Sequence, residues 1–150
     1  MTHLTHKQAP VRVLLTGFSA FPGAPVNPTE DLALALHRRR ASFVAYGIEL
    51  ETRVLPVVYS AIGPAIARHA RALAPDVILH FGLAAERSWI SIETLARNRV
   101  NTIYPDAAGQ RSKSNKLVQG GRSKQRARVP VAEMAAALRR AGYPCRLSKD

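Results

Sequence analysis

The order of apolar and polar residues predicts alternating strands and helices over the first half of the chain. Residues 13–15 are a short apolar run, which is typical of a buried strand. Residues 28–40 return to helical spacing, and Asn27 is the expected N-cap of that helix. Residues 43–58 are rich in Val, Tyr, Ile and Leu, which predicts one or two strands broken near Gly47.

The same alternation continues through the middle of the chain. Residues 60–73 have helical spacing, and residues 77–81 form an apolar run that is typical of a central parallel strand. Strand, helix, strand, helix and strand in this order is the signature of an α/β protein. The sequence therefore predicts an α/β fold with a mostly parallel sheet covered by helices on both faces.

The pattern is less regular in the second half. Residues 89–96 alternate and predict another ordered segment, whereas residues 99–129 predict a basic, irregular loop. Pro130 is expected to open a last helix, and residues 145–147 to start a further strand. The core-facing side of the last helix is expected to hold Met134, Ala137, Leu138 and Ala141.

Composition narrows the class of protein. A chain of 150 residues with 47% hydrophobic residues suits one globular domain. Residues 1–10 are expected to be a flexible terminus without the apolar core of a signal peptide, and no later run is long enough to cross a bilayer. Cys145 is the only cysteine, which excludes an internal disulfide and a Cys-based zinc cluster. We therefore expect a cytoplasmic protein without a metal.

The formal net charge of +12 lies mostly in the second half of the chain. Asp106 is the only acid between residues 99 and 128, and Tyr104 is the only aromatic residue there. The cations that follow it are Arg111, Lys113, Lys116, Arg122, Lys124, Arg126 and Arg128. Because single-strand binders interleave several stacking rings with their cations, we favour a solvated basic loop over a specific nucleic-acid site.

The loop after the first predicted strand is the first candidate site. Gly17 is expected to turn the backbone at the strand end, which places Phe18 and Phe21 in the loop. This loop, TGFSAFPG, lacks the G-x-G-x-x-G spacing of a dinucleotide site, and the chain has no GK[ST] phosphate loop. Ligands of open α/β sheets bind beyond the carboxyl ends of strands. The two rings therefore either line an apolar, non-phosphate site or cap the core.

Five segments of the chain carry motifs that occur together in one known family. They are, in order, VLLTGFSAFPGAPVNPTE, VLPVVYSA, PDVILHFGLAAERSWISIETLARN, YPDAAG and AALRRAGYPCRLSKD. Together they resemble the pyroglutamyl peptidase I, or pyrrolidone-carboxylate peptidase, family over nearly all of residues 12–150. The pairing of TGFxxFxGxxxNP with GLAxxRxxISIExxAxN is much more specific than either half alone.

The resemblance implies both an activity and a fold. Members are cytosolic cysteine peptidases that remove an N-terminal pyroglutamyl residue from peptides without a metal or cofactor. Their fold is a three-layer α/β/α sandwich of the phosphorylase/hydrolase-like kind, with a mostly parallel, twisted sheet. They commonly assemble into tetramers, so the resemblance also implies a peptide substrate and a homo-oligomer.

The resemblance assigns roles to five residues. Glu93, in ISIETLARN, matches the acidic member of a Cys-His-Glu triad, where a carboxylate orients the imidazole that takes the thiol proton. Phe18 and Phe21 would sandwich or line the flat, uncharged pyrrolidone ring, and Gly82 and Leu83 would sit at the pocket edge.

The chain also departs from the family pattern. In the family a Tyr-x-Cys-Asn segment supplies the nucleophile and the histidine follows later, whereas this sequence stops at SKD. We therefore expect residues 11–150 to be the N-terminal portion of a single domain, truncated and inactive alone. Cys145 precedes the RLSKD run and is expected to be a small buried residue. Ile103 stands where many members have Arg, and Glu86 where Gly is usual.

Two alternatives to a shortened peptidase stay open. One is a noncatalytic remnant that still binds a pyroglutamyl-like ligand or a full-length partner. The other is a basic nucleic-acid-binding module that uses residues 111–128. None of the five histidines is expected to complete the triad, although His80 in VILHF lies closest to the predicted pocket.

Overall fold

The structure is a computed structural model that describes residues 9–100 and 102–149. Residues 1–8 of the predicted flexible terminus, residues 1–10, lie outside the described residues. Two compact units are present: unit 1 comprises Met1–Leu83 and Asp106–Gln110, and unit 2 comprises Ala84–Pro105 and Arg111–Asp150. The single domain expected over residues 11–150 stays a prediction.

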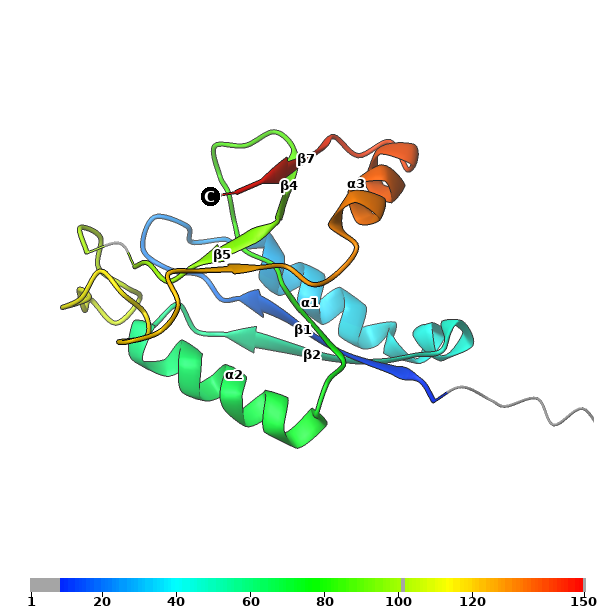
Figure 1. The fold of residues 1–150 in the computed structure, drawn as a ribbon, viewed down its shortest axis with the longest axis horizontal. Coiled ribbons are helices and arrows are strands. Elements are labelled where there is room, and N and C mark those ends of the chain that lie inside the picture. The colour runs from blue at the N-terminus through cyan, green and yellow to red at the C-terminus, as the bar shows by residue number, and fades with distance from the viewer. Residues whose placement is uncertain (1–8, 101, 150) are drawn as a thin grey trace, which may run out of the picture. The chain divides into compact units, whose positions relative to one another are not determined.

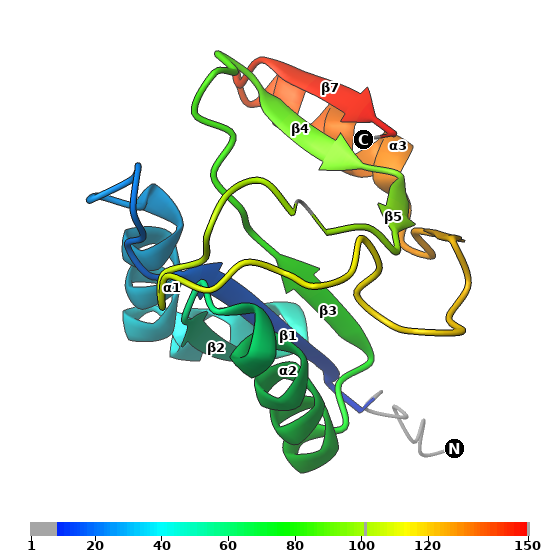
Figure 2. The same cartoon turned by 90° about the vertical axis from the view of Figure 1, so that its left-hand side faces the viewer.

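Unit 1 contains a parallel three-stranded sheet. Its strands are β1 (Val11–Phe18), β2 (Ile48–Leu55) and β3 (Val77–His80), in the order β2-β1-β3. Figure 2 shows β1 between its two neighbours. The α/β fold with a parallel sheet is thereby confirmed. Among the described strands β3 pairs with β1 alone, so β1 and not the 77–81 run is central.

Two helices connect these strands. The helix α1 (Pro28–Arg38) joins β1 to β2, and α2 (Tyr59–Leu73) joins β2 to β3. The two crossovers run in opposite directions across the sheet, and parallel crossovers are right-handed, so the helices cover opposite faces. Figure 1 shows α1 and α2 on either side of β1 and β2. Both predicted helices are therefore confirmed.

The segment after α1 differs from its prediction. Residues 43–46 were expected to be in a strand, but they belong to η1, a 3-10 helix over Arg40–Tyr46 that Gly47 ends in the left-handed conformation. Val44 and Tyr46 are 69% and 80% exposed, so no sheet neighbour covers them. Strand propensity depends on such packing, which explains why it does not decide the structure here.

A small apolar cluster lies between α1 and the sheet. Leu15, Ala33 and Leu50 are buried at its centre. Gly17 lies inside β1 and does not turn the backbone, which corrects the sequence prediction. A Cβ at this position would lie 2.1 Å from the carbonyl oxygen of Thr29, so glycine allows α1 to approach β1 closely.

Unit 2 contains two small sheets and one helix. The strands β4 (Ile90–Glu93) and β7 (Cys145–Ser148) pair in parallel, while β5 (Leu95–Arg97) and β6 (Lys124–Arg126) pair antiparallel. The predicted strand at residues 145–147 is confirmed, and the irregular 99–129 segment is interrupted only by β6 among its described residues.

The last helix, α3 (Val131–Arg140), leads into β7 within unit 2. Ala135 is its buried residue, at 1% exposed, whereas Ala137 and Ala141 are exposed. The predicted core-facing side is therefore wrong for these two alanines, because a run of small residues gives little contrast from which to assign a face. No described helix is long and apolar enough to cross a membrane.

Candidate functional site

The loop after β1 is held in a tight turn. Phe18 ends β1 and is half-buried, and the backbone N–H of Ser19 donates to the carbonyl of Leu55 at 3.0 Å. Phe21 and Ala24 exchange two backbone hydrogen bonds of 3.1 and 2.8 Å around Pro22 and Gly23. Gly23 has a φ of 91°, which suits glycine at the third position of such a turn. Phe21 is thereby fixed in a half-buried position.

The start of α1 holds the other end of this loop. Asn27 is the N-cap, as predicted, and its side-chain oxygen accepts from the Thr29 N–H at 3.1 Å. Its amide Nδ2 donates back to the carbonyl of Ser19 at 3.2 Å. The Thr29 hydroxyl accepts from the Phe18 N–H at 3.0 Å. These bonds tie both sides of the loop to one helix N-terminus, which makes it a rigid place for a site.

The segment after β3 starts at the same sheet edge. The Phe81 N–H donates to the carbonyl of Thr16 at 2.8 Å, so Gly82 and Leu83 follow β3 beside the end of β1. Gly82 is exposed and Leu83 is half-buried. Unit 1 therefore brings together the ends of β1 and β3, which carry four of the five predicted site residues.

His80 faces the central strand. Its Nδ1 lies 2.7 Å from the hydroxyl of Thr16, which is fully buried. Desolvation lowers the pKa of His80 below its ordinary value, even though the residue keeps an exposed side. The lowered pKa favours a neutral His80 imidazole, which is hydrogen-bonded to the Thr16 hydroxyl.

Glu93 lies in unit 2, at the end of β4. Its side chain is 43% exposed, and its carboxylate pairs with the Arg87 guanidinium at 3.3 Å. The same guanidinium donates to the Ser91 hydroxyl at 2.9 Å, so Arg87 bridges two residues on one side of the strand. Cys145 is 6% exposed and pairs in register with Ile90. Unit 2 contains Glu93 and Cys145 but no histidine.

Comparison with known protein families assigns the chain to one family. The sequence profile described as pyroglutamyl peptidase matches residues 11–150. The chain belongs to the pyroglutamyl peptidase family. The pyrrolidone-carboxylate peptidase of Pyrococcus furiosus is 31% identical over 140 residues, which are 93% of this chain and 65% of that protein. That of Chromobacterium violaceum is 33% identical over 138 residues, covering 92% and 64%.

Solved structures of the family have a similar fold. The pyrrolidone carboxyl peptidase of Fervidobacterium islandicum AW-1 matches with a TM-score of 0.85 and 28% identity, covering 93% of this chain and 65% of that one. The Thermus thermophilus enzyme matches with a TM-score of 0.80 and 34% identity, covering 91% and 68%. The chain thus spans about two thirds of the length of the peptidases that it matches.

No role was predicted from the sequence for two residues that the structure shows in specific contacts, Arg87 and Asp106. Arg87 holds Glu93, and its place six residues before the acid in GLAAERSWISIE was a usable signal. Asp106 belongs to unit 1, is 3% exposed, and accepts from the N–H groups of Gln110, Tyr59 and Ala108 at 2.8, 3.0 and 3.0 Å. As the one acid in a basic stretch, it could have been recognised as a structural residue.

The surroundings of Asp106 set its charge state. Desolvation alone would raise the pKa of Asp106, but the three N–H donors outweigh it and hold that pKa below its ordinary value. The ionised carboxylate accepts from Tyr59, the first residue of α2, whose own N-cap Val58 offers no side-chain acceptor. Asp106 therefore fixes the start of α2 and the 106–110 turn together.

Two open hollows lie in unit 2, and their lining includes none of the predicted site residues. One, of about 380 Å³, is lined by Thr94, Leu95, Lys124, Arg126 and Lys149. The other, of about 500 Å³, is lined by Ala96, Arg97, Asn98, Leu117, Val118, Gly121, Arg122 and Gln125. On β7, the Arg146 guanidinium stacks on Trp89 at 3.9 Å from the ring centre. In the described part of the chain, no three His, Cys, Asp or Glu side chains gather as a metal site would require.

Proposed function

We propose that the chain supplies the substrate-binding loop and the acidic catalytic residue of a pyroglutamyl peptidase, which removes N-terminal pyroglutamate from peptides. The observation that carries the proposal is the match to the family over residues 11–150. The resemblance also supports a cytoplasmic location and a homo-oligomer as parts of the proposal.

Phe18 and Phe21 are proposed to hold the pyroglutamyl ring. This lactam is flat and uncharged, so aromatic walls and a few backbone hydrogen bonds suit it. The two rings are half-buried, and the bonds from Asn27 and Thr29 fix the loop that carries them. Gly82 and Leu83, at the end of β3, are proposed as the edge of this pocket.

Glu93 is proposed as the carboxylate of a Cys-His-Glu triad. In such a triad the thiolate attacks the pyroglutamyl carbonyl carbon, and the imidazole passes the thiol proton to the departing amine. The carboxylate orients the imidazole and stabilises its positive charge. Arg87 is proposed as a positioning residue, because it binds both Glu93 and Ser91.

We propose that these 150 residues do not turn over substrate unaided. Glu93 and Cys145 share unit 2, which contains no histidine, and Cys145 is buried beside Ile90. The nucleophile of a cysteine peptidase is the thiolate, which forms when an adjacent imidazole takes the thiol proton. Binding of a pyroglutamyl ligand without hydrolysis is the second candidate function, which the same observation favours.

Two measurements on the purified chain test these proposals. Release of coumarin from a pyroglutamyl-coumarin substrate should stay at background, and turnover that a thiol blocker stops would contradict the exclusion of Cys145. In calorimetry, a pyroglutamyl peptide should bind, and Phe18→Ala should weaken binding about tenfold because a ring contact is lost. Tyr46→Ala is the matched control, since that ring is 80% exposed. Equal binding by the chain and Phe18→Ala would contradict the pocket.

A further inference from the structure

The ladder of β5 and β6 places three cations on one face. Leu95 pairs with Arg126, and Arg97 pairs with Lys124, across the antiparallel register. Paired residues, and residues two apart on one strand, share a face of a sheet. Arg97, Lys124 and Arg126 therefore project from the same face, and both β6 cations are exposed.

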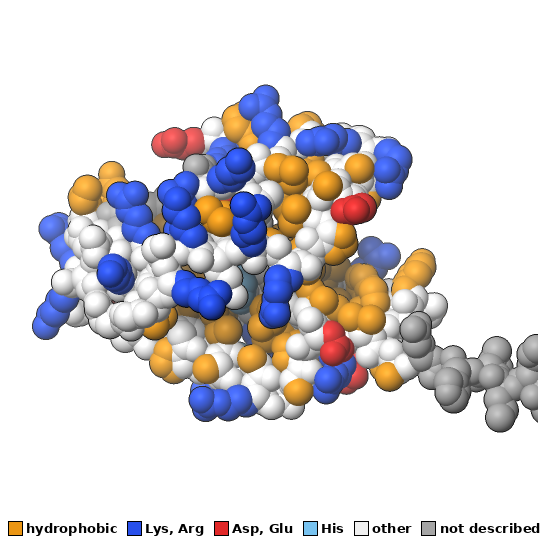
Figure 3. All heavy atoms as spheres, viewed as in Figure 1, with side chains coloured by type: hydrophobic (Ala, Val, Ile, Leu, Met, Phe, Trp, Pro, Cys, Tyr) orange, Lys and Arg blue, Asp and Glu red, His pale blue; other side chains and the backbone are white. Residues whose placement is uncertain are grey.

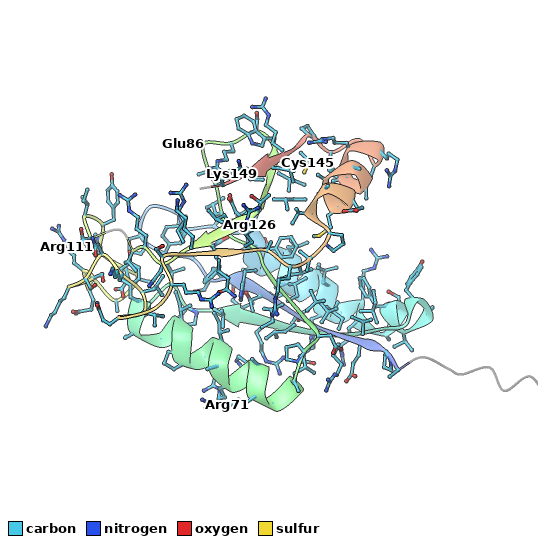
Figure 4. The ribbon with its side chains drawn as sticks, in the orientation of Figure 1. Arg71, Glu86, Arg111, Arg126, Cys145 and Lys149 are labelled. Carbon is cyan, nitrogen blue, oxygen red and sulfur yellow. The ribbon has the colours of Figure 1, made fainter. Side chains whose placement is uncertain are left out.

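The hollow at Thr94 adds a fourth cation. Lys149 lines it together with Lys124 and Arg126, and Figure 4 shows Arg126 and Lys149 extending into the same part of unit 2. The Arg97 guanidinium donates twice to the Lys149 carbonyl, at 2.6 and 3.0 Å, which fixes this segment against the ladder. Arg97, Lys124, Arg126 and Lys149 are called the cationic face below.

No carboxylate compensates these charges among the described residues. The residues that line the Thr94 hollow include no acid. Glu93, which precedes Thr94 in the chain, pairs with Arg87. Unit 2 as a whole has 14 Lys and Arg against 4 Asp and Glu. Four like charges so close together repel one another, and an anionic ligand would relieve that repulsion.

The positive charge extends beyond the Thr94 hollow. Arg97 and Arg122 both line the second hollow, of about 500 Å³. There is no Asp or Glu between residues 107 and 132. The other exposed cations of that stretch are Arg111, Lys113, Lys116 and Arg128. In Figure 3, Lys and Arg side chains gather over β5, β6 and the loop that precedes β6. A single small anion would leave most of these charges unused, so a polymer with repeated charges fits them better.

We propose that the cationic face and the exposed cations of residues 111–128 bind the phosphate backbone of a nucleic-acid duplex, with one phosphate in the Thr94 hollow. Contacts between cations and phosphates are independent of base sequence and need no stacking rings. Tyr104 is the only aromatic residue between residues 99 and 128, which disfavours single strands but not a duplex.

Fluorescence anisotropy of a labelled 20-base-pair duplex, titrated with the 150-residue chain at several salt concentrations, tests this proposal. The logarithm of the binding constant should fall linearly with the logarithm of salt concentration. The double variant Lys124→Ala/Arg126→Ala should bind roughly tenfold more weakly at low salt, and its salt slope should be smaller by about 1.8, or about 0.9 for each lost phosphate contact. Lys124→Glu/Arg126→Glu should weaken binding further.

The matched control is Arg68→Ala/Arg71→Ala, which removes two exposed arginines from α2 in unit 1. It changes the net charge by the same amount and should leave the duplex affinity within about twofold. Equal weakening by the control, or binding that does not respond to salt, would overturn the proposal. Displacement of the duplex by millimolar inorganic phosphate would show a small-anion site instead, and displacement by polyglutamate at equal charge would show an acidic protein as the partner. Unfolding midpoints of all variants should match that of the parent chain.

Discussion

Unit 1 and unit 2 bury different amounts of apolar side chain. Among the residues that the structure describes, the buried hydrophobic ones of unit 1 are Leu14, Leu15, Ala24, Ala33, Leu50 and Leu55, whereas those of unit 2 are Val100, Ala135 and Cys145. Burial of large side chains is the main favourable term in folding. We infer that unit 1 contributes more of the stability, and that unit 2 should unfold locally at a lower free energy.

The charge of the chain is divided just as unequally. Unit 1 has 8 Lys and Arg against 6 Asp and Glu, while unit 2 has 14 against 4. Repulsion between like charges destabilises a compact state. Unit 2 therefore combines little apolar burial with a large positive charge, and amide hydrogen exchange, which reports on each unit separately, should show this contrast.

The largest effect is expected for Gly17→Ala. The new Cβ would lie 2.1 and 2.7 Å from the Thr29 carbonyl oxygen and carbon, and backbone atoms cannot move aside as a flexible side chain can. We expect a loss of about 4 kcal/mol or more in the free energy of unfolding of unit 1. Hydrogen exchange would locate this loss in β1 and α1.

Gly63→Ala is the control for that prediction. Gly63 lies within α2 just before Pro64, and apart from its chain neighbours and the backbone of the helix itself no atom comes within 4 Å of an added Cβ. Alanine is the better helix former, but Pro64 disfavours the helical conformation of a preceding alanine, so this variant should change the free energy of unfolding by only about 1 kcal/mol or less. If the two alanine variants had the same stability, the close approach of α1 to β1 would be wrong.

A smaller effect is expected when the two units are compared at one leucine each. Leu14 is fully buried in β1, whereas Leu147 in β7 is 47% exposed. Leu14→Ala should cost about 3 kcal/mol, because it removes apolar contacts and leaves a cavity. Leu147→Ala should cost less than about 1 kcal/mol. Urea unfolding measures both, and equal losses would remove the contrast between the units.

Asn27→Ala tests the link between the loop and α1. The variant loses the cap of Thr29 and the bond to Ser19, and Asn27 is 4% exposed, so we expect a loss of about 2 kcal/mol. Asn27→Asp keeps the acceptor for Thr29 but cannot donate to Ser19. It should therefore lose only part of that amount, and full loss would place the main role of Asn27 in the Ser19 bond.

The smallest effect is a pH dependence confined to unit 1. The pKa of His80 is lowered in the folded chain, so the unfolded chain takes up the proton first as the pH falls. The stability from the neutral ring is present above about pH 6.5 and is lost as the pH falls towards the folded pKa. Hydrogen-exchange protection, corrected for intrinsic rates, should fall in unit 1 between pH 7.5 and 5.5, and less so in His80→Gln.

Unit 2 is the internal control for this measurement, because it contains no histidine. Its protection should not change over the same pH range. A fall of equal size in unit 2 would show that general charge repulsion, and not His80, causes the pH dependence.

The sequence predicted unit 1 better than unit 2 for a physical reason. In unit 1 the helices and strands are long enough for their periodicity to show, and Asn27 marks a helix start by its own chemistry. The strands β5 and β6 have three residues each, and β6 consists of exposed Lys, Gln and Arg. Such a short polar strand is specified by its partner across the ladder, which local sequence does not reveal.

The candidate site was predicted unevenly for a similar reason. Motif spacing placed Phe18 and Gly82 at the ends of β1 and β3, where parallel strands bring loops together. It placed Arg87 and Glu93 in one motif but did not establish that they pair, because that contact depends on side-chain conformations within unit 2. It also gave Gly17 the wrong role, because a close approach between elements has the same local signature as a turn.

The stacking of Arg146 on Trp89 makes it possible to follow the unfolding of the two units separately. Trp89 is the only tryptophan of the chain and lies in unit 2. Its fluorescence emission should therefore change when the stacking on Arg146 of β7 is lost as unit 2 unfolds. The far-ultraviolet circular dichroism comes mostly from the 26 residues of α1 and α2 in unit 1, against 10 in α3. Two optical signals recorded in one denaturant titration can therefore show whether the units melt together or in sequence.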